Sequence, residues 1–370
     1  MRLATVFSGI GAPEYALERL LGKDNVQIVF ACDCGECKLR DKKSKDPLLP
    51  EEVEYLESIK DDAFRQQETK RIYSSLRKRH WVRETYQNNY RITEDKWHDD
   101  IRFINGKAYR GQVDLFIGGS PCQSFSNMGH QGGLEDARGT LFYSFAKLVR
   151  DIQPKAFIFE NVPGMLTNNK GETWKTILSI FESLDYKIVF KEILNSMDFG
   201  IPQNRRRLFV VGIKDEQKAA LFVAPQKIKL KRYAAAFRDS NVPAKYYLGL
   251  LGFNFTTTNT ARARINMDII RTEKKNQQFN WNGDFIFEPI AAVQNRPDVL
   301  ARAYVGQYNG QTGAVRKMTP AECHKLMGFD VRDFIVCEND TEAYKQSGNS
   351  IVVNVMEALI KSVIDTGAIQ

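Results

Sequence analysis

The chain has 370 residues, 43% of them hydrophobic, so it is long enough to bury a large core and to form one large domain with a smaller one. Its formal net charge is +8, and residues 225–300 hold twelve Lys or Arg against six Asp or Glu, which predicts an anionic partner for that stretch. The N-terminal sequence lacks a signal-peptide pattern, and no apolar run has the length of a membrane span. We therefore expect a cytoplasmic protein without membrane contact and, since no obligate protein partner is evident, a monomer.

Cysteine and histidine usage argues against a metal site. In a cytoplasmic protein the six cysteines are expected to be reduced. Cys32, Cys34 and Cys37 lie close together, but zinc prefers four ligands and no further Cys or His stands nearby in the sequence. The four histidines are scattered along the chain, which makes a His-based cluster or catalytic triad hard to assemble. The sequence predicts no metal, and a core or pocket-lining role for these three cysteines.

The N-terminal residues have the pattern of a nucleotide-binding sheet. Residues 3–7 are apolar, glycines follow at positions 9 and 11, and residues 15–21 have helical spacing. A second apolar stretch at 26–31 predicts the next buried strand. Strand, glycine turn, helix and strand together predict the opening of a doubly wound α/β sheet.

Residues 36–105 contain no glycine and mix charges of both signs. Apolar residues at helical spacing predict a helical insertion at about 38–95. The favoured interpretation is a solvated helical hairpin that pads one end of the sheet, because mixed charge is common on plain surfaces. An arm that contacts nucleic acid is the alternative.

Further strands are predicted at 113–118, 156–160, 186–194 and 207–213, with a helix at 141–149. The alternation of strand and helix favours a parallel sheet. After Lys214 the pattern changes to aromatic and Thr/Asn-rich runs without helical period, including 253–259, which is typical of an irregular, β-rich small domain. Helices return at 319–327, with Thr319 as cap and Pro320 at the first helical position, and at 351–364.

The glycine turn carries the first chemical signal. Its glycines let the backbone approach a cofactor, and Asp33 follows the next strand at the spacing of an acid that binds ribose hydroxyls. Pro13 and Glu14 stand where a phosphate-binding turn has its third glycine, and a glutamate is unfavourable beside pyrophosphate. A nucleoside without phosphates, such as S-adenosylmethionine, therefore fits better than a dinucleotide; a purely structural turn is the alternative.

Cys122 carries the second signal. It follows the strand at 113–118 and the turn Gly119-Ser120-Pro121, which would hold a nucleophile at the carboxyl edge of the sheet. The glycine-flanked residues 123–138 have the composition of a flap that closes over a substrate. A small core residue is the alternative for an isolated cysteine.

Two further segments end or begin strands at the same edge. Glu160 could protonate or hydrogen-bond a ring nitrogen of a heterocycle, while Asn161 could equally form a cap or turn. In Gln203-Asn-Arg-Arg-Arg207 the two-residue period predicts that Arg205 and Arg207 point to one face, where their guanidiniums converge. A basic edge strand is the alternative.

Taken together, these blocks resemble the cytosine-5 DNA methyltransferase family of the prokaryotic and phage type, in the family's order. The resemblance covers 1–213 and 316–370, through segments at 7–11, 118–126, 138–142, 160–162, 203–207, 316–320, 327–329 and 344–350. It implies an S-adenosylmethionine-dependent methyltransferase fold with the catalytic domain in 1–213, a target-recognition domain in 214–315 and a return to the catalytic domain in 316–370.

The resemblance also implies the chemistry. A cytosine is flipped out of double-stranded DNA, Cys122 adds to its C6, Glu160 contacts N3 and the amino group, Arg207 contacts O2, and the activated C5 takes the methyl group of S-adenosylmethionine. Arg205 is placed with these catalytic residues. The cofactor-binding residues implied are Phe7, Ser8, Gly9, Ile10, Gly11, Asp33, Cys34, Asp100, Ile101, Gly119, Pro121, Leu141, Asn349 and Ser350.

The DNA-binding residues expected are Gln123, Ser126, Arg138, Gln203, Arg262, Arg264, Arg271, Lys274 and Lys275, the last five as phosphate contacts. The implied role is DNA modification in a restriction-modification system, or protection of phage or host DNA. Because Asn349 resembles a residue that reaches the methionine end of the cofactor, the C-terminal helix is expected to fold back on the first domain. A tRNA cytosine-5 methyltransferase, which uses the same blocks on RNA, is the nearest rival.

Overall fold

The computed structural model describes residues 1–40, 46–120, 141–276, 278–279 and 281–369. The chain forms two compact units. Unit 1 comprises Met1–Leu194, Arg206–Gln226 and Val355–Gln370, and unit 2 comprises Asn195–Arg205 and Lys227–Asn354. The functional boundaries expected at 213/214 and 315/316 stay a prediction, although by contacts residues 316–354 group with unit 2.

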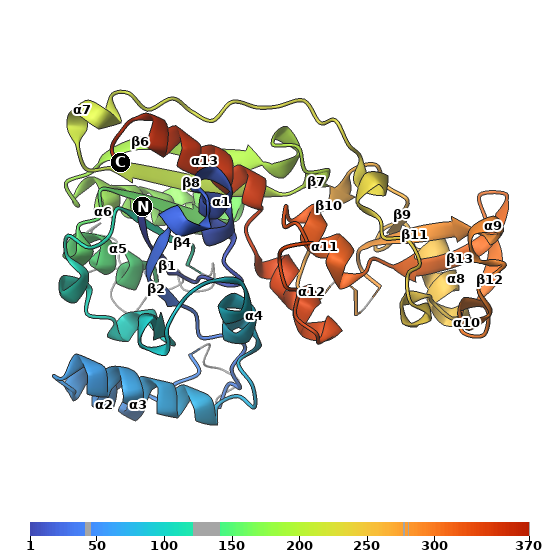
Figure 1. The fold of residues 1–370 in the computed structure, drawn as a ribbon, viewed down its shortest axis with the longest axis horizontal. Coiled ribbons are helices and arrows are strands. Elements are labelled where there is room, and N and C mark those ends of the chain that lie inside the picture. The colour runs from blue at the N-terminus through green and yellow to red at the C-terminus, as the bar shows by residue number, and fades with distance from the viewer. Residues whose placement is uncertain (41–45, 121–140, 277, 280, 370) are drawn as a thin grey trace. The chain divides into compact units, whose positions relative to one another are not determined.

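Unit 1 is built on a seven-stranded sheet in the order β3-β2-β1-β4-β5-β8-β6 (Figure 1). The strands are β1 (Arg2–Val6), β2 (Gln27–Cys32), β3 (Trp97–His98), β4 (Leu115–Gly118), β5 (Ala156–Asn161), β6 (Lys187–Asn195) and β8 (Arg206–Ile213). The pairs from β3 to β5 are parallel, as expected. The expectation of a parallel sheet is wrong at β8, which pairs antiparallel with β5, because the short stretch between β6 and β8 holds no crossover helix.

Helices cover both faces of this sheet. On one face α5 (Leu141–Ile152) and α6 (Glu172–Glu182) pack on the strands through a phenylalanine-rich core. Its rings come from sheet and helices alike and include Phe30, Phe116, Phe142, Phe145, Phe157, Phe159 and Phe181. On the other face α1 (Ala12–Leu21) and α13 (Val353–Asp365) lie side by side (Figure 1). The short α7 (Glu216–Ala219) also belongs to unit 1.

The C-terminal helix returns to unit 1 from Val355 onward, which confirms the expected fold-back. Val355, Leu359 and Val363 are buried, as their spacing along one helical face predicts. Arg19 of α1 and Glu357 of α13 form an ion pair with 3.0 Å between Nε and Oε2. The C-terminal helix thereby packs beside α1 and belongs to the helical layer on this face of the sheet.

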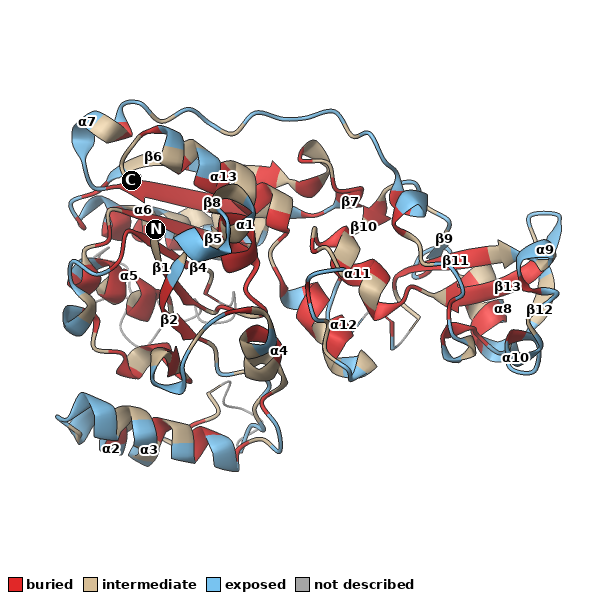
Figure 2. Cartoon of the chain, viewed as in Figure 1, coloured by how far each residue is buried: buried red, intermediate tan, exposed pale blue. Residues whose placement is uncertain are grey.

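The insertion is helical, as predicted. It forms α2 (Pro50–Ser58), α3 (Asp62–Ser75) and α4 (Trp81–Asn89). Leu56, Ile72, Tyr73 and Leu76 form a small core of their own with Phe103, whereas Phe64 on α3 is 48% exposed. Figure 2 shows exposed positions alternating with buried ones along α2 and α3, in keeping with amphipathic helices.

Unit 2 holds a four-stranded sheet in the order β12-β13-β11-β9 and a two-stranded sheet, β10-β7. Its strands are β7 (Gln203–Asn204), β9 (Arg264–Ile265), β10 (Ile270–Arg271), β11 (Asp284–Pro289), β12 (Val305–Tyr308) and β13 (Gln311–Lys317). Its helices are α8 (Leu250–Thr258), α9 (Ile290–Val293), α10 (Pro297–Leu300), α11 (Pro320–Leu326) and α12 (Asp340–Asn349).

For two helices of unit 2 the predictions from the sequence had opposite outcomes: one was confirmed and the other was wrong. In α11 the predicted cap is confirmed: Thr319 Oγ1 accepts the N–H of Glu322 at 3.0 Å, and Glu322 Oε2 accepts the N–H of Thr319 at 2.7 Å. The prediction for 253–259 is wrong, because this run lies mostly in α8. Its threonine hydroxyls donate to carbonyls one turn back, as in Thr256 to Gly252 O at 2.8 Å, so polar residues are accommodated without an amphipathic period.

Arg316 on β13 is the central buried charge of unit 2. Its guanidinium donates to Glu322 through Nη1 at 2.8 Å and Nη2 at 2.9 Å, and to Glu288 Oε1 through Nε at 2.6 Å. These contacts tie β13 to β11 and to the start of α11.

No helix within the described ranges has the length and apolar character needed to cross a membrane.

Candidate active site

The glycine turn after β1 connects the ends of two parallel strands. Ser8 donates its backbone N–H to Cys32 O at 3.1 Å, and its hydroxyl accepts the N–H of Cys32 at 3.0 Å. Phe7 and Gly9 have φ angles of 55° and 54°. Among the described residues, apart from its two chain neighbours, no atom lies within 4 Å of a Cβ built on Gly9. The turn therefore leaves open space above Gly9, as a cofactor cradle requires.

Asp33 extends this cradle from the end of β2. Its Oδ2 accepts the N–H of Gly9 at 2.9 Å, and its Oδ1 accepts the N–H of Gly35 at 2.7 Å. An ionised carboxylate offers about four acceptor positions, so each oxygen keeps capacity for a ribose hydroxyl. The side chain is half-buried, and its chemistry fits the predicted role.

Gly11 and Glu14 make close contacts within the fold, and the cofactor role of Gly11 stays a prediction. A Cβ on Gly11 would lie 2.2 Å from the ring of Tyr90, whose hydroxyl donates to Gly11 O at 2.6 Å. Glu14 is fully buried, and its Oε1 accepts hydroxyl hydrogen bonds from Thr5 at 2.6 Å and Tyr86 at 2.7 Å. Burial raises the pKa of Glu14 to about 7 against the lowering effect of these two bonds. Glu14 thus points into the core, which removes it as a neighbour of the cofactor.

Asp100 and Ile101, expected beside the adenine, are both buried. Asp100 Oδ1 accepts the backbone N–H of Arg102 at 2.9 Å, and its Oδ2 accepts Arg102 Nη2 at 2.7 Å and the Tyr73 hydroxyl at 2.7 Å. The carboxylate is therefore anchored by groups of the protein. Its contact with adenine stays a prediction, as does that of Ile10, which is also buried.

Glu160 and Arg207 meet at the carboxyl end of β5. Glu160 Oε1 and Arg207 Nε lie 3.0 Å apart, with only 13% and 18% of the two side chains exposed. A Cβ on Gly119 would lie 2.7 Å from Glu160 Oε2, so a glycine is needed for the segment after β4 to pass this carboxylate. The structure thus brings three predicted residues, Gly119, Glu160 and Arg207, together.

Asn161 is a site residue that the sequence reasoning treated mainly as a turn former. Its side chain is buried and donates from Nδ2 to Ser120 O at 2.7 Å, while its Oδ1 accepts the N–H of Val162 at 2.9 Å. Asn161 thereby fixes the last described residue before Pro121 and Cys122. Its position next to Glu160 in the sequence is the feature that could have indicated this role.

Several predicted residues lie outside the described residues. These are the nucleophile Cys122 together with Pro121, Gln123, Ser126 and Arg138. Leu141, the next cofactor candidate, begins α5 and packs partly against the phenylalanine-rich core.

The predicted convergence of Arg205 with Arg207 is wrong. Arg205 is buried, and its guanidinium donates to Glu273 O at 2.9 Å, Gly348 O at 3.0 Å and Ser350 O at 2.7 Å. β7 ends at Asn204 and β8 begins at Arg206, so Arg205 lies between the two strands. Arg205 holds unit 2 together through three carbonyls.

Gln203 is also structural, which contradicts its expected contact with DNA. It is fully buried, donates from Nε2 to Leu326 O at 2.9 Å and accepts the N–H of Glu273 at 3.0 Å. Asn349, by contrast, is exposed at the end of α12, and Ser350 caps that helix and is buried. The cofactor roles of Asn349 and Ser350 stay a prediction.

The cationic residues of unit 2 divide into two groups. Arg271 is committed to the fold: it pairs with Asp284 at 3.4 Å and donates to the carbonyls of Arg262 and Gly283, so its expected phosphate contact is not supported. The exposed cationic candidates are Arg262, Arg264, Lys274 and Lys275.

The cysteines near the glycine turn do not form a metal cluster. Cys32 is buried, Cys37 is half-buried and Cys34 is exposed. Among residues with described positions, no group of three or more His, Cys, Asp or Glu is arranged to hold a metal ion.

Comparisons with known proteins place this geometry in a family. The family model described as C-5 cytosine-specific DNA methylase matches residues 60–365. The type II methyltransferase M.HpaII of Haemophilus parainfluenzae is 32% identical over 313 residues, covering 77% of this chain and 80% of that protein. The type II methyltransferase M1.ScrFI of Lactococcus lactis subsp. cremoris is 33% identical over 290 residues, covering 76% and 69%.

A solved structure supports the fold independently. The Entamoeba histolytica methyltransferase EhMeth superposes with a TM-score of 0.62 at 18% identity, over 99% of this chain and 98% of that one. At this identity the match concerns the fold alone, and it agrees with the predicted α/β methyltransferase architecture.

Proposed function

The chain belongs to the C-5 cytosine-specific DNA methylase family, and we propose that it methylates a flipped-out cytosine within a specific sequence of double-stranded DNA through covalent attack by Cys122. The observation that carries this proposal is the Glu160–Arg207 pair, 3.0 Å apart, beside Gly119. The pair lies beside Gly119, which directly follows β4 and precedes Cys122 by three positions in the sequence. The family's chemistry requires an acid near the nucleophile.

The proposed reaction runs on the residues of unit 1. The Cys122 thiolate forms a bond to C6 of the cytosine, while Glu160 hydrogen-bonds N3 and the exocyclic amino group, so the ring electrons move toward C5. C5 then takes the methyl group, whose bond to the sulfonium sulfur of S-adenosylmethionine breaks so that S-adenosylhomocysteine leaves, and C5 loses its proton to a base. Elimination of Cys122 from C6 restores the aromatic ring and the thiolate.

Arg207 has two tasks in this scheme. Its Nε holds Glu160 Oε1, which orients the carboxylate, and the rest of the guanidinium can donate to the cytosine O2. Asn161 supports the same site indirectly, because its bond to Ser120 O fixes the backbone that leads to the nucleophile.

S-adenosylmethionine supplies the methyl group, as in the family as a whole. In this chain we assign its adenosine to the cradle formed by Gly9 and Asp33, where the backbone is open and the carboxylate keeps acceptor capacity. Cys34, Gly119 and Leu141 are proposed as neighbours.

Unit 2 is the proposed reader of the DNA sequence, with the functional recognition segment at 214–315. Exposed Arg262, Arg264, Lys274 and Lys275 would contact phosphates. Two relatives carry the name type II methyltransferase, which supports a modification role beside a restriction enzyme. We further propose a monomer that acts in the cytoplasm.

Two assays test this function. Bisulfite sequencing of plasmid DNA from expressing cells should reveal one methylated sequence motif, absent with Cys122→Ala. In vitro, labelled S-adenosylmethionine should label plasmid DNA and leave tRNA unlabelled. Label on tRNA with none on DNA would contradict the proposal and favour the RNA enzyme.

A further inference from the structure

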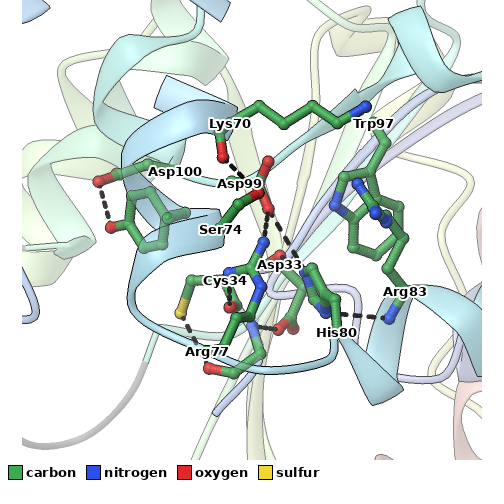
Figure 3. A network of polar contacts seen from close by, with 12 residues as sticks. Asp33, Cys34, Lys70, Ser74, Arg77, His80, Arg83, Trp97, Asp99 and Asp100 are labelled. Atoms are coloured by element: carbon green, nitrogen blue, oxygen red, sulfur yellow. Dashed lines mark hydrogen bonds and ion pairs between the residues drawn. The ribbon is translucent and has the colours of Figure 1, made fainter. Parts of the chain in front are cut away.

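The insertion reaches the expected adenosine site through α3 and the turn that follows it. Three of its side chains hydrogen-bond to three different cofactor candidates, and Figure 3 shows two of them, Arg77 and His80, close to Cys34 and Asp33. The bonds are Tyr73 Oη to Asp100 Oδ2 at 2.7 Å, Arg77 Nη1 to Cys34 O at 2.7 Å, and His80 Nε2 to Asp33 O at 3.1 Å.

A buried polar cluster around Asp99 holds Arg77 and His80. Arg77 forms an ion pair with Asp99 through Nη2, and His80 Nε2 lies 3.4 Å from the same carboxylate oxygen. The three side chains are at most 5% exposed. Burial alone would raise the pKa of Asp99, but the His80 hydrogen bond and the Arg77 charge lower it. Asp99 therefore stays ionised and holds both side chains in place.

The orientation of His80 follows from its second ring nitrogen. His80 Nδ1 accepts the backbone N–H of Arg83 at 3.3 Å, which leaves the proton on Nε2, facing Asp33 O. A Cβ on Gly35 would lie 2.8 Å from His80 Cε1, so the ring packs directly on the turn after Asp33. Because Gly35 N also donates to Asp33 Oδ1, the ring supports the backbone that orients this carboxylate.

In the described part of the insertion, several basic side chains on the outer surface are paired with acids. Arg71 pairs with Glu68 and Lys70 with Glu94, at 2.8 and 2.6 Å. Paired charges present little net potential to phosphates. The insertion thus directs its distinctive polar contacts inward, toward Asp33, Cys34 and Asp100.

We propose that Tyr73, Arg77 and His80 are positioning residues that hold Asp33, Cys34 and Asp100 in the geometry that binds the adenosine of S-adenosylmethionine. The proposal rests on the proposed function of this site. It gives the insertion a task in cofactor binding, separate from DNA recognition and from the chemistry at Cys122.

Calorimetric titration of the full chain with S-adenosylhomocysteine tests the proposal. Tyr73→Phe removes one hydroxyl and keeps the ring, and we expect about 3- to 10-fold weaker binding, the range for one lost hydrogen bond. The KM for S-adenosylmethionine should rise by the same factor, with kcat and the KM for DNA unchanged. Tyr55→Phe is the matched control, because its exposed hydroxyl bonds Glu68 at 3.0 Å on the same insertion; its binding should equal that of the wild type.

Arg77→Lys provides a second variant that keeps the charge and loses the bridge between Cys34 O and Asp99. A folded Tyr73→Phe protein that binds S-adenosylhomocysteine with wild-type affinity would overturn the proposal, whatever affinity is measured for Arg77→Lys. A raised KM for DNA with an unchanged KM for S-adenosylmethionine would overturn it in favour of a DNA arm. A wild type that binds S-adenosylhomocysteine but never methylates DNA would contradict the proposed function alone.

Discussion

The Glu160 carboxylate and the Arg207 guanidinium form an ion pair with 3.0 Å between Oε1 and Nε. Glu160→Gln keeps the shape of this side chain and removes its charge and proton. Because positioned acids contribute about 10²- to 10⁴-fold to rate, we expect kcat to fall within that range. Single-turnover transfer of labelled methyl groups to DNA measures the effect.

Binding of S-adenosylhomocysteine is the control for Glu160→Gln and should stay at the wild-type value. A variant with wild-type kcat would remove Glu160 from the chemistry. Weakened cofactor binding with normal turnover would reassign it to the cofactor site.

Asn161→Ala tests the support of the nucleophile segment. The substitution removes the bond from Nδ2 to Ser120 O and leaves a buried carbonyl without that donor, a cost of about 1–3 kcal/mol. We expect kcat to fall by about 5- to 150-fold with unchanged cofactor affinity. Asn168→Ala, which removes a 2.7 Å bond to Thr173, is the control and should retain full activity; equal losses in both variants would refute a specific role for Asn161.

Glu14 predicts a pH dependence of stability. Burial raises its pKa from 4.5 to about 7 in the folded protein, so folding favours the protonated form. The stabilising effect is complete below pH 4.5 and is lost as the pH rises through 7. Between pH 5 and 8 the free energy of unfolding should fall by roughly 2–3 kcal/mol more in the wild type than in Glu14→Gln.

Urea unfolding of both proteins at several pH values measures this difference. The comparison cancels the titration of all other groups, because only position 14 differs. Parallel stability curves for the wild type and Glu14→Gln would show that Glu14 does not titrate in this range.

The exposed cations of unit 2 predict a salt-dependent loss of DNA affinity. Arg262→Gln with Arg264→Gln should weaken DNA binding at all sequences and reduce the slope of log affinity against log salt by about 0.9 per lost phosphate contact. Arg271→Gln should instead lower the stability of unit 2, because Arg271 pairs with buried Asp284. Binding titrations at several salt concentrations and urea unfolding separate these effects; an unchanged slope in the double variant would exclude the two arginines.

Local patterns in the sequence predicted local structure well. The cap at Thr319, six of the seven strands of the large sheet and the C-terminal helix each depend on residues close together in the sequence, and all are confirmed. The short strand β3 was not predicted. Gly119 and Glu160 lie together because they stand at the carboxyl ends of the neighbouring parallel strands β4 and β5. Arg207, at the start of β8, joins them only because β8 runs antiparallel to β5, which the expected parallel sheet would not give.

Predictions that depended on distant partners failed. Arg205 and Gln203 were predicted as site residues from the family resemblance and, for Arg205, from the two-residue period. Arg205 instead bonds to carbonyls 68 to 145 positions away, and Gln203 bonds to Leu326. Neither contact leaves a periodic signal in the sequence. The sequence likewise did not predict that Tyr73, Arg77 and His80 contact the cofactor candidates. Amphipathic spacing shows which face of a helix is buried, but not which residues that face packs against.

Covalent trapping of Cys122 tests the central claim most directly. A duplex that carries 5-fluorocytosine at the methylated position cannot lose a proton from C5, so the bond between Cys122 and C6 should persist after methyl transfer. With S-adenosylmethionine present, we predict a denaturation-resistant protein–DNA complex whose peptide map places the methylated base on Cys122, and no complex with Cys122→Ala. Trapping at another residue, or equal trapping by Cys122→Ala, would contradict the mechanism.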